Sequence, residues 1–205
     1  MSGMRTLPLV LYGGSFNPPH LGHTAAARTL WEALSPCRVV IMPALCPPHK
    51  TPPEGTPPAK HRLKLCHLAF KAIPYTEVSD YEMLSGASGY TIDTLRHLQR
   101  EHPRAEITLA VGPDMLVTLD KWKEGPALLR EFSIAALGRE PGQDKLLQDA
   151  KARLERDFGA QVRLIPHTPV AVSSTQAREA LRNGGGEGLV PEAALLYIWE
   201  SGLYV

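Results

Sequence analysis

Two hydrophobic periods alternate along this 205-residue chain: one typical of buried strands and one typical of amphipathic helices. Short apolar runs predict strands at 7–12, 39–43, 77–80, 107–112, 133–137 and 162–166. Helical periods predict helices at 23–34, 61–72, 91–101, 145–158, 174–183 and 191–201. The repeated strand–helix alternation predicts a single α/β domain over residues 1–205. We expect a doubly wound, mostly parallel sheet with helices on both faces.

Composition and charge narrow the possible functions. Lys and Arg total 22 against 21 Asp and Glu, so no electrostatic case exists for binding nucleic acid or an anionic membrane surface. No apolar run approaches the ~20 residues of a membrane-spanning helix, and no signal-peptide pattern precedes the first strand. We therefore expect a cytoplasmic location, and a homo-oligomer remains possible. The spacing of Cys37, Cys46 and Cys66 favours free thiols over disulfides or a metal site.

The segment 13–23, with the sequence GGSFNPPHLGH, separates the first strand from the first helix. Two glycines at a strand end let the backbone turn sharply and approach a ligand closely. His20 and His23 are placed to share one face at the helix amino end, where free N–H groups and the helix dipole favour anions. Neither a Walker loop nor a dinucleotide fingerprint is present. The pattern indicates a phosphate site, and the alternative is a turn with two surface histidines.

A second polar segment, 173–178 with the sequence SSTQAR, opens a helix near the carboxyl end. Its hydroxyl groups and free N–H groups suit phosphate, and Arg178 follows Ser174 by one turn. Its guanidinium could therefore bind two phosphate oxygens at once. The alternative is an ordinary helix cap.

The two segments together resemble the two signatures of the HxGH-type nucleotidyltransferase superfamily, with Asn17 where the family usually has Asp. Four further stretches, 42–50, 89–95, 112–122 and 189–204, resemble the bacterial nicotinate-nucleotide adenylyltransferases, although Gly89 replaces their Ser and Glu140 follows Arg139 atypically. The resemblance covers nearly the whole chain. It implies a Rossmann-like fold of the nucleotidyltransferase type. It also implies adenylyl transfer from ATP to nicotinate mononucleotide, a step of NAD biosynthesis that yields deamido-NAD and pyrophosphate.

The resemblance also implies residue roles. The catalytic groups would be His20, His23, Lys50 and Arg178; ATP would bind Gly13, Gly14, Ser15, Phe16, Gly112, Asp114, Ser174 and Thr175; the mononucleotide would bind Tyr90, Thr91 and Trp122. Lys50 lies in the proline-rich stretch 44–59, which we expect to be a mobile loop. Mg²⁺ is expected on the triphosphate without a protein cage. Alternatively, Tyr90 and Trp122 are core residues, Asp114 is a helix cap and Lys50 is a solvated charge.

Other functions stay open at this point. The acceptor could be nicotinamide mononucleotide or phosphopantetheine, or the chain could be a cytidylyltransferase. A non-catalytic nucleotide sensor on the same fold is a further alternative. The stretch around Trp122 and the carboxyl-terminal tail argue against the other transferases, and the intact pair of signature segments argues against the sensor.

Overall fold

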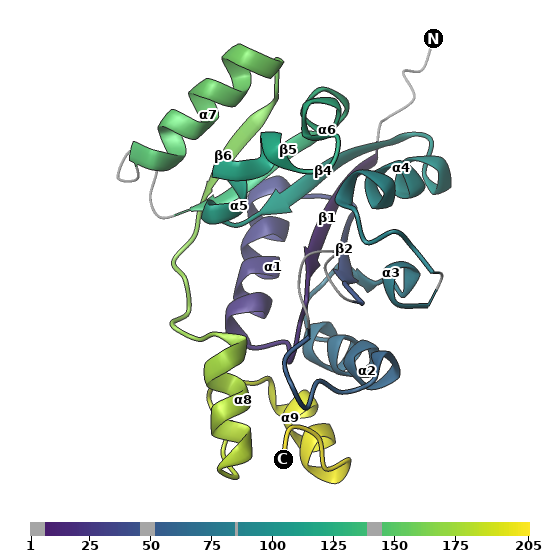
Figure 1. Ribbon diagram of the computed structural model, residues 1–205, viewed down its shortest axis with the longest axis vertical. Helices are drawn as coiled ribbons and strands as arrows, with labels where there is room; N and C mark the ends of the chain where they lie inside the picture. The colour runs from purple at the N-terminus through teal and green to yellow at the C-terminus, as the bar shows by residue number, and fades with distance from the viewer. Residues whose placement is uncertain (1–6, 46–51, 85, 139–144) are drawn as a thin grey trace.

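A computed structural model describes residues 7–45, 52–84, 86–138 and 145–205 (Figure 1). Six strands in these ranges form one sheet in the order β3-β2-β1-β4-β5-β6, and every neighbouring pair is parallel. The strands are β1 (Leu7–Gly14), β2 (Arg38–Pro43), β3 (Thr76–Val78), β4 (Ala105–Val111), β5 (Ser133–Gly138) and β6 (Val162–Pro166). The expected doubly wound sheet is thereby confirmed.

Each strand is followed by one or more helices. They are α1 (Leu21–Leu34), α2 (Ala59–Phe70), α3 (Tyr81–Leu84), α4 (Thr91–Glu101), α5 (Pro113–Thr118), α6 (Gly125–Glu131), α7 (Lys145–Phe158), α8 (Ser174–Arg182) and α9 (Glu192–Glu200), with a 3₁₀ turn η1 (Leu119–Lys121). The sequence did not predict α3, α5, η1 or α6. None of the described helices is long and apolar enough to cross a membrane.

The sheet separates two hydrophobic cores. Alternate side chains of a strand point to opposite faces, so Val10 joins one core while Leu9 and Leu11 join the other. The first core contains residues of α1, α2, α8 and α9, and the second contains residues of α4, α5, α6 and α7 (Figure 1). Helices therefore cover both faces, as a parallel sheet requires.

The strand order reverses at the centre of the sheet. From β1 the chain first adds β2 and β3 on one side, and later adds β4, β5 and β6 on the other. The connections at the carboxyl ends of β1 and β4 therefore diverge, which opens a crevice between them. In open α/β sheets this crevice is where ligands bind.

Candidate active site

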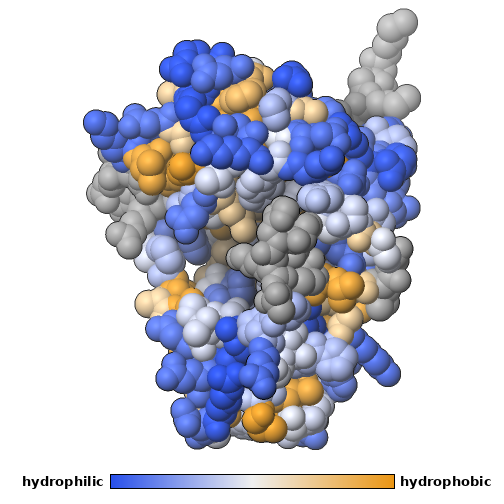
Figure 2. Space-filling model, viewed as in Figure 1, coloured by the Kyte–Doolittle hydropathy of each residue, from blue (hydrophilic) through white to orange (hydrophobic). Residues whose placement is uncertain are grey.

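A cavity of about 820 Å³ lies at the carboxyl ends of β1 and β4. Figure 2 shows it as a hollow in the middle of the face viewed. Gly13 and Gly14 end β1, and Gly112 directly follows β4. The remaining wall comes from α1, α2, α5 and the start of α8, together with Leu45 and the segment 52–56. Of the predicted site residues, the cavity is lined by Gly13, Gly14, Ser15, Phe16, His23, Gly112, Asp114, Ser174 and Arg178.

The turn after β1 depends on Phe16, whose backbone has a φ of 43° and whose ring is 1% exposed. The ring packs edge-on against Phe70 and His23, with centroids 5.5 and 4.9 Å away. A Cβ on Gly14 would lie 3.1 Å from this ring, so the position has little room for a side chain. The turn therefore exposes backbone groups at Gly13 and Gly14 to the cavity while its aromatic side chain is buried in the core.

His20 and His23 lie at the amino end of α1, where His20 is the N-cap residue. Their rings stack with centroids 3.6 Å apart. The backbone N–H of His20 donates to Nδ1 of His23 at 3.2 Å. Because Nδ1 accepts this bond, the proton of the neutral ring is on Nε2, which makes that atom a hydrogen-bond donor. His23 lines the cavity, whereas His20 is not among the lining residues.

Both histidines are neutral at physiological pH. Burial lowers the pKa of His20 to about 4. Burial, and secondarily the charge that His20 would carry, lowers the pKa of His23 to about 3. A buried imidazole without a nearby carboxylate loses more by desolvation than it gains as a cation. The pair is therefore uncharged, and His23 offers a neutral donor to the cavity.

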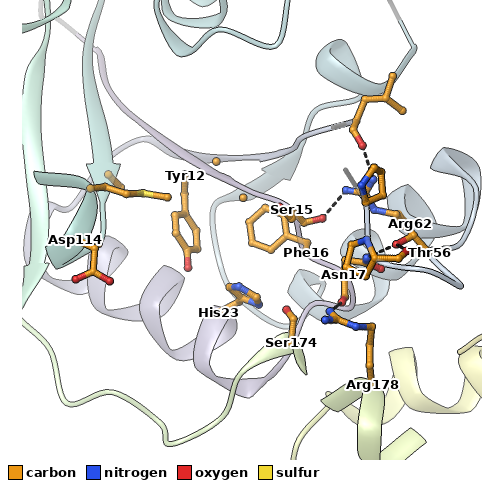
Figure 3. Close-up of a pocket in the computed structure, with 18 of the residues that line it drawn as sticks. Tyr12, Ser15, Phe16, Asn17, His23, Thr56, Arg62, Asp114, Ser174 and Arg178 are labelled. Carbon is orange, nitrogen blue, oxygen red and sulfur yellow. Dashed lines mark hydrogen bonds between the residues drawn. The ribbon is translucent and has the colours of Figure 1, made fainter. Parts of the chain in front are cut away.

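The two signature segments contact each other directly. Ser173 caps α8 by a reciprocal pair of bonds with Gln176. Ser174 Oγ donates to the carbonyl of Pro18 at 3.1 Å. Arg178 donates from Nη1 to the carbonyl of Asn17 at 2.7 Å and from Nη2 to Thr175 Oγ1 at 3.1 Å. These bonds hold the amino end of α8 against the turn after β1, and in Figure 3 Ser174 lies beside His23 while Arg178 reaches Asn17.

Arg62 and Asn17 are structural members of the site to which the sequence reasoning gave no role. Arg62 on α2 is 4% exposed and donates to the carbonyls of Ser15, Ala44 and Leu45. It thus connects the loop after β1 with the loop after β2. Only the replacement of the family's Asp by Asn17 drew attention to that position. The partners of Arg62 are too distant in sequence for any local pattern to indicate them.

Several predicted site residues lie elsewhere. Tyr90, the N-cap of α4, and Trp122, which ends η1, pack against the second core and do not line the cavity. Thr91 begins α4 and Thr175 is exposed on α8, also outside the lining. Lys50 and Arg139 lie outside the described residues.

Comparison with known proteins agrees with this geometry. Residues 11–180 match the cytidylyltransferase-like family, and the chain therefore belongs to that family. Relatives described as probable nicotinate-nucleotide adenylyltransferases include one from Thermus thermophilus, 36% identical over 95% of this chain and 97% of its own. Another, from Gemmatimonas aurantiaca, is 35% identical over 96% of this chain and 92% of its own. The chain thus belongs with the nicotinate-nucleotide adenylyltransferases, as its motifs indicated.

The fold also has solved counterparts. A nicotinic acid mononucleotide adenylyltransferase of Plasmodium falciparum, complexed with NaAD, superposes with a TM-score of 0.73. The match covers 97% of both chains at 18% identity. The same protein complexed with APC gives a TM-score of 0.74. At this level of identity the likeness establishes the fold.

Proposed function

We propose that this chain transfers the adenylyl group of ATP to nicotinate mononucleotide. The observation that carries the proposal is the junction of the two signature segments, which places His23, Ser174 and Arg178 on one cavity wall. Donors and a fixed cation gathered at the switch point of a parallel sheet suit polyphosphate. The names of the full-length relatives support the adenylyl donor and the acceptor.

The reaction makes one bond and breaks one. An oxygen of the acceptor phosphate forms a bond to the α-phosphorus of ATP. The bond from that phosphorus to the oxygen bridging the β-phosphate breaks, and pyrophosphate leaves with that electron pair. The second pKa of a phosphate monoester is about 6, so the acceptor is already a dianion near neutral pH. Catalysis therefore needs no strong base and relies on positioning and on charge stabilisation.

The residues of the cavity can supply both. We assign Nε2–H of His23 to donate to a phosphate oxygen. The stacked ring of His20 and its backbone N–H, which donates to Nδ1 of His23, hold the His23 ring in its orientation. Arg178 supplies positive charge, and backbone N–H groups at Ser174 and Thr175 complete the anion site at the start of α8. Gly13, Gly14, Ser15 and Phe16 offer backbone groups to the phosphates.

The nucleosides are assigned to the two ends of the site. Gly112 and Asp114 at the start of α5 face the cavity and suit the ribose hydroxyls of ATP. Tyr90, Thr91 and Trp122 are assigned to the pyridine ring, which would extend from the cavity toward α4. Lys50 is assigned to the acceptor phosphate on the family resemblance alone.

The side chains of this site suit a divalent metal ion that is bound mainly by the triphosphate. Within the described residues, no group of three or more His, Cys, Asp or Glu side chains is arranged to hold a metal ion. Among the lining residues that the structure describes, Asp114 is the sole carboxylate. This donor set suits Mg²⁺ that arrives on the triphosphate and keeps most of its water, rather than a protein cage. Bound in this way, Mg²⁺ would neutralise phosphate charge.

A pyrophosphate-release assay with ATP and a panel of acceptors tests the proposal. We expect turnover with nicotinate mononucleotide, and far less with nicotinamide mononucleotide or phosphopantetheine. Turnover with phosphopantetheine alone would reassign the acceptor. ATP binding without pyrophosphate release on any acceptor would identify a sensor and overturn the proposal.

A further inference from the structure

A buried side chain beside the cavity connects three distant parts of the chain. Asn17 is 5% exposed, and its carboxamide makes two hydrogen bonds. Tyr204 Oη donates to Asn17 Oδ1 at 2.7 Å, across 187 residues of sequence. Asn17 Nδ2 donates to Thr56 Oγ1 at 2.8 Å. The carboxyl-terminal tail is therefore linked through Asn17 to the segment 52–58, which precedes α2.

A bond between Thr56 and Pro53 determines which groups donate and which accept in this series. Thr56 Oγ1 donates its only proton to the carbonyl of Pro53 at 2.6 Å, so toward Asn17 it can only accept. An Asn at position 17 supplies the required N–H donor. An ionised Asp at this position has no donor and would face the oxygen of Thr56 with another acceptor. Asn17 is therefore matched to Thr56 in this chain.

The chain of bonds ends at the cavity wall. Asn17, Pro53 and Thr56 all line the cavity. In Figure 3, Asn17 and Thr56 lie at the side away from Asp114, the residue assigned to the ATP ribose. Tyr204 itself is 6% exposed. Its backbone φ is 65°, a conformation that residues other than glycine rarely adopt. The tail is therefore buried where its Tyr204 hydroxyl bonds Asn17.

We infer that Tyr204 and Asn17 are positioning residues that hold the segment 52–58 against the acceptor side of the cavity. The bond from Tyr204 to Asn17 and the bond from Asn17 to Thr56 set the position of the wall that the mononucleotide meets. The backbone carbonyl of Asn17 also accepts from Arg178, so the same residue aligns the phosphate wall with the acceptor wall. The inference rests on the proposed function, which assigns the acceptor phosphate to Lys50, two residues before this segment in the sequence.

The first test compares single-bond variants in steady-state kinetics. Thr56→Val removes the hydroxyl at nearly constant volume, Thr56→Ser keeps it, and Tyr204→Phe removes only the first bond. Tyr197→Phe is the matched control, since the Tyr197 hydroxyl bonds His61 at 2.8 Å outside the cavity lining. We expect Thr56→Val and Tyr204→Phe to raise KM for the mononucleotide roughly 5- to 10-fold. KM for ATP should change less than about 2-fold, and Thr56→Ser and Tyr197→Phe should resemble wild type.

A double-variant cycle asks whether the bonds act as one unit. If the tail acts through Asn17 on Thr56, Tyr204→Phe should add little to Thr56→Val, and Asn17→Asp should resemble Thr56→Val. Equal rises of KM for both substrates would indicate general loosening and overturn the inference. Wild-type KM in Tyr204→Phe, or failure of Thr56→Ser to restore KM, would also overturn it.

Hydrogen exchange separates this inference from the proposed function. The amide of Thr56 donates to the Pro53 carbonyl at 3.1 Å, so its exchange rate reports how firmly the segment is held. In protein without substrate, Tyr204→Phe should accelerate exchange at Thr56 and Tyr197→Phe should not. Unchanged exchange in Tyr204→Phe would overturn the positioning role even if wild type turns over nicotinate mononucleotide. Accelerated exchange in a protein inactive on that acceptor would retain the anchoring and reject only the proposed function.

Discussion

The stacking of His20 on His23 depends on the glycine between them. A Cβ on Gly22 would lie 3.0 Å from two atoms of the His20 ring, so a side chain there would push the ring out of its place. The ring of His23 stacks on that imidazole and makes a T-shaped contact with the ring of Phe16. These contacts fix its orientation before any ligand arrives, which is the preorganisation that electrostatic catalysis requires.

We predict that His23→Ala lowers kcat by roughly 10²-fold or more, a loss of about 2.7 kcal/mol of transition-state stabilisation. The physical reason is the loss of a fixed donor, Nε2–H, at the phosphate site. Steady-state pyrophosphate release measures it. His61→Ala is the control, since that imidazole bonds Tyr197 and does not line the cavity. A His23→Ala enzyme with near wild-type kcat would remove His23 from the mechanism.

Among the elements, those with a clear helical period or a well-bounded apolar run are the ones that the sequence predicted best. The expected bounds of α4, α7 and β6 coincide with the observed ones. The chain from 113 to 131 was missed, because α5 has six residues, η1 has three and α6 begins with Gly125 and Pro126. Elements this short complete too few turns for a hydrophobic period to be visible.

Contacts between elements could be predicted only in part. The two signature segments were recognisable from their residue types, because glycine turns and helix amino ends have local signals. The bonds that join them span 156 and 161 residues, and no pattern along the chain indicates such pairs. No pattern along the chain indicates the bonding partners of Arg62 and Tyr204 either. The sequence therefore indicated the two segments that meet at the cavity, whereas the contacts that join them required the structure.

The amino end of α4 carries a prediction about the acceptor. Tyr90 is the N-cap, and its carbonyl accepts from Asp93 and Thr94. The N–H groups of Thr91 and Ile92 precede these first intrahelical bonds, so they are available to an anion at the positive end of the helix dipole. A carboxylate only accepts hydrogen bonds, whereas an amide NH₂ donates them. We therefore expect kcat/KM to favour nicotinate over nicotinamide mononucleotide by on the order of 10² or more.

Trp122→Ala tests the predicted contact with the pyridinium ring, as distinct from the contact with its carboxylate. Indole stacking on the pyridinium ring acts on both mononucleotides alike, so this variant should weaken both and preserve much of the preference. Trp199→Ala is a matched control, because Trp199 is 43% exposed on α9 and does not line the cavity. Steady-state kinetics on both mononucleotides gives the four values needed. Equal kcat/KM for acid and amide in wild type would contradict the specificity but not the adenylyl transfer.

For the whole molecule, the cavity makes function and folding stability depend on the same groups. Its walls come from β1, β4, α2, α5 and α8, so residues from both halves of the sheet meet there. Groups buried at such a junction are dehydrated by the complete fold and not by one element. The His20–His23 pair is therefore exposed to water when the chain unfolds, and its protonation must influence the global free energy of unfolding.

This linkage predicts a loss of stability in mild acid. An unfolded histidine has a pKa of about 6.5, whereas burial lowers the pKa of His20 to about 4 and that of His23 to about 3. Between these values the unfolded chain binds protons that the folded chain does not. The free energy of unfolding should thus be highest above pH 6.5 and fall as pH decreases, by about 1.4 kcal/mol per pH unit for each such imidazole.

Urea unfolding of wild type and His23→Gln between pH 4.5 and 7.5 measures the share of His23. Several other groups also titrate differently in the two states. Burial lowers the pKa of His167 and raises that of Glu82, and these contributions are common to both proteins. The difference between the two slopes therefore isolates position 23. We expect His23→Gln to lose less stability on acidification, by up to about 1.4 kcal/mol per pH unit. Parallel slopes would mean that His23 is protonated equally in the folded and unfolded states, and would contradict its burial as a neutral donor.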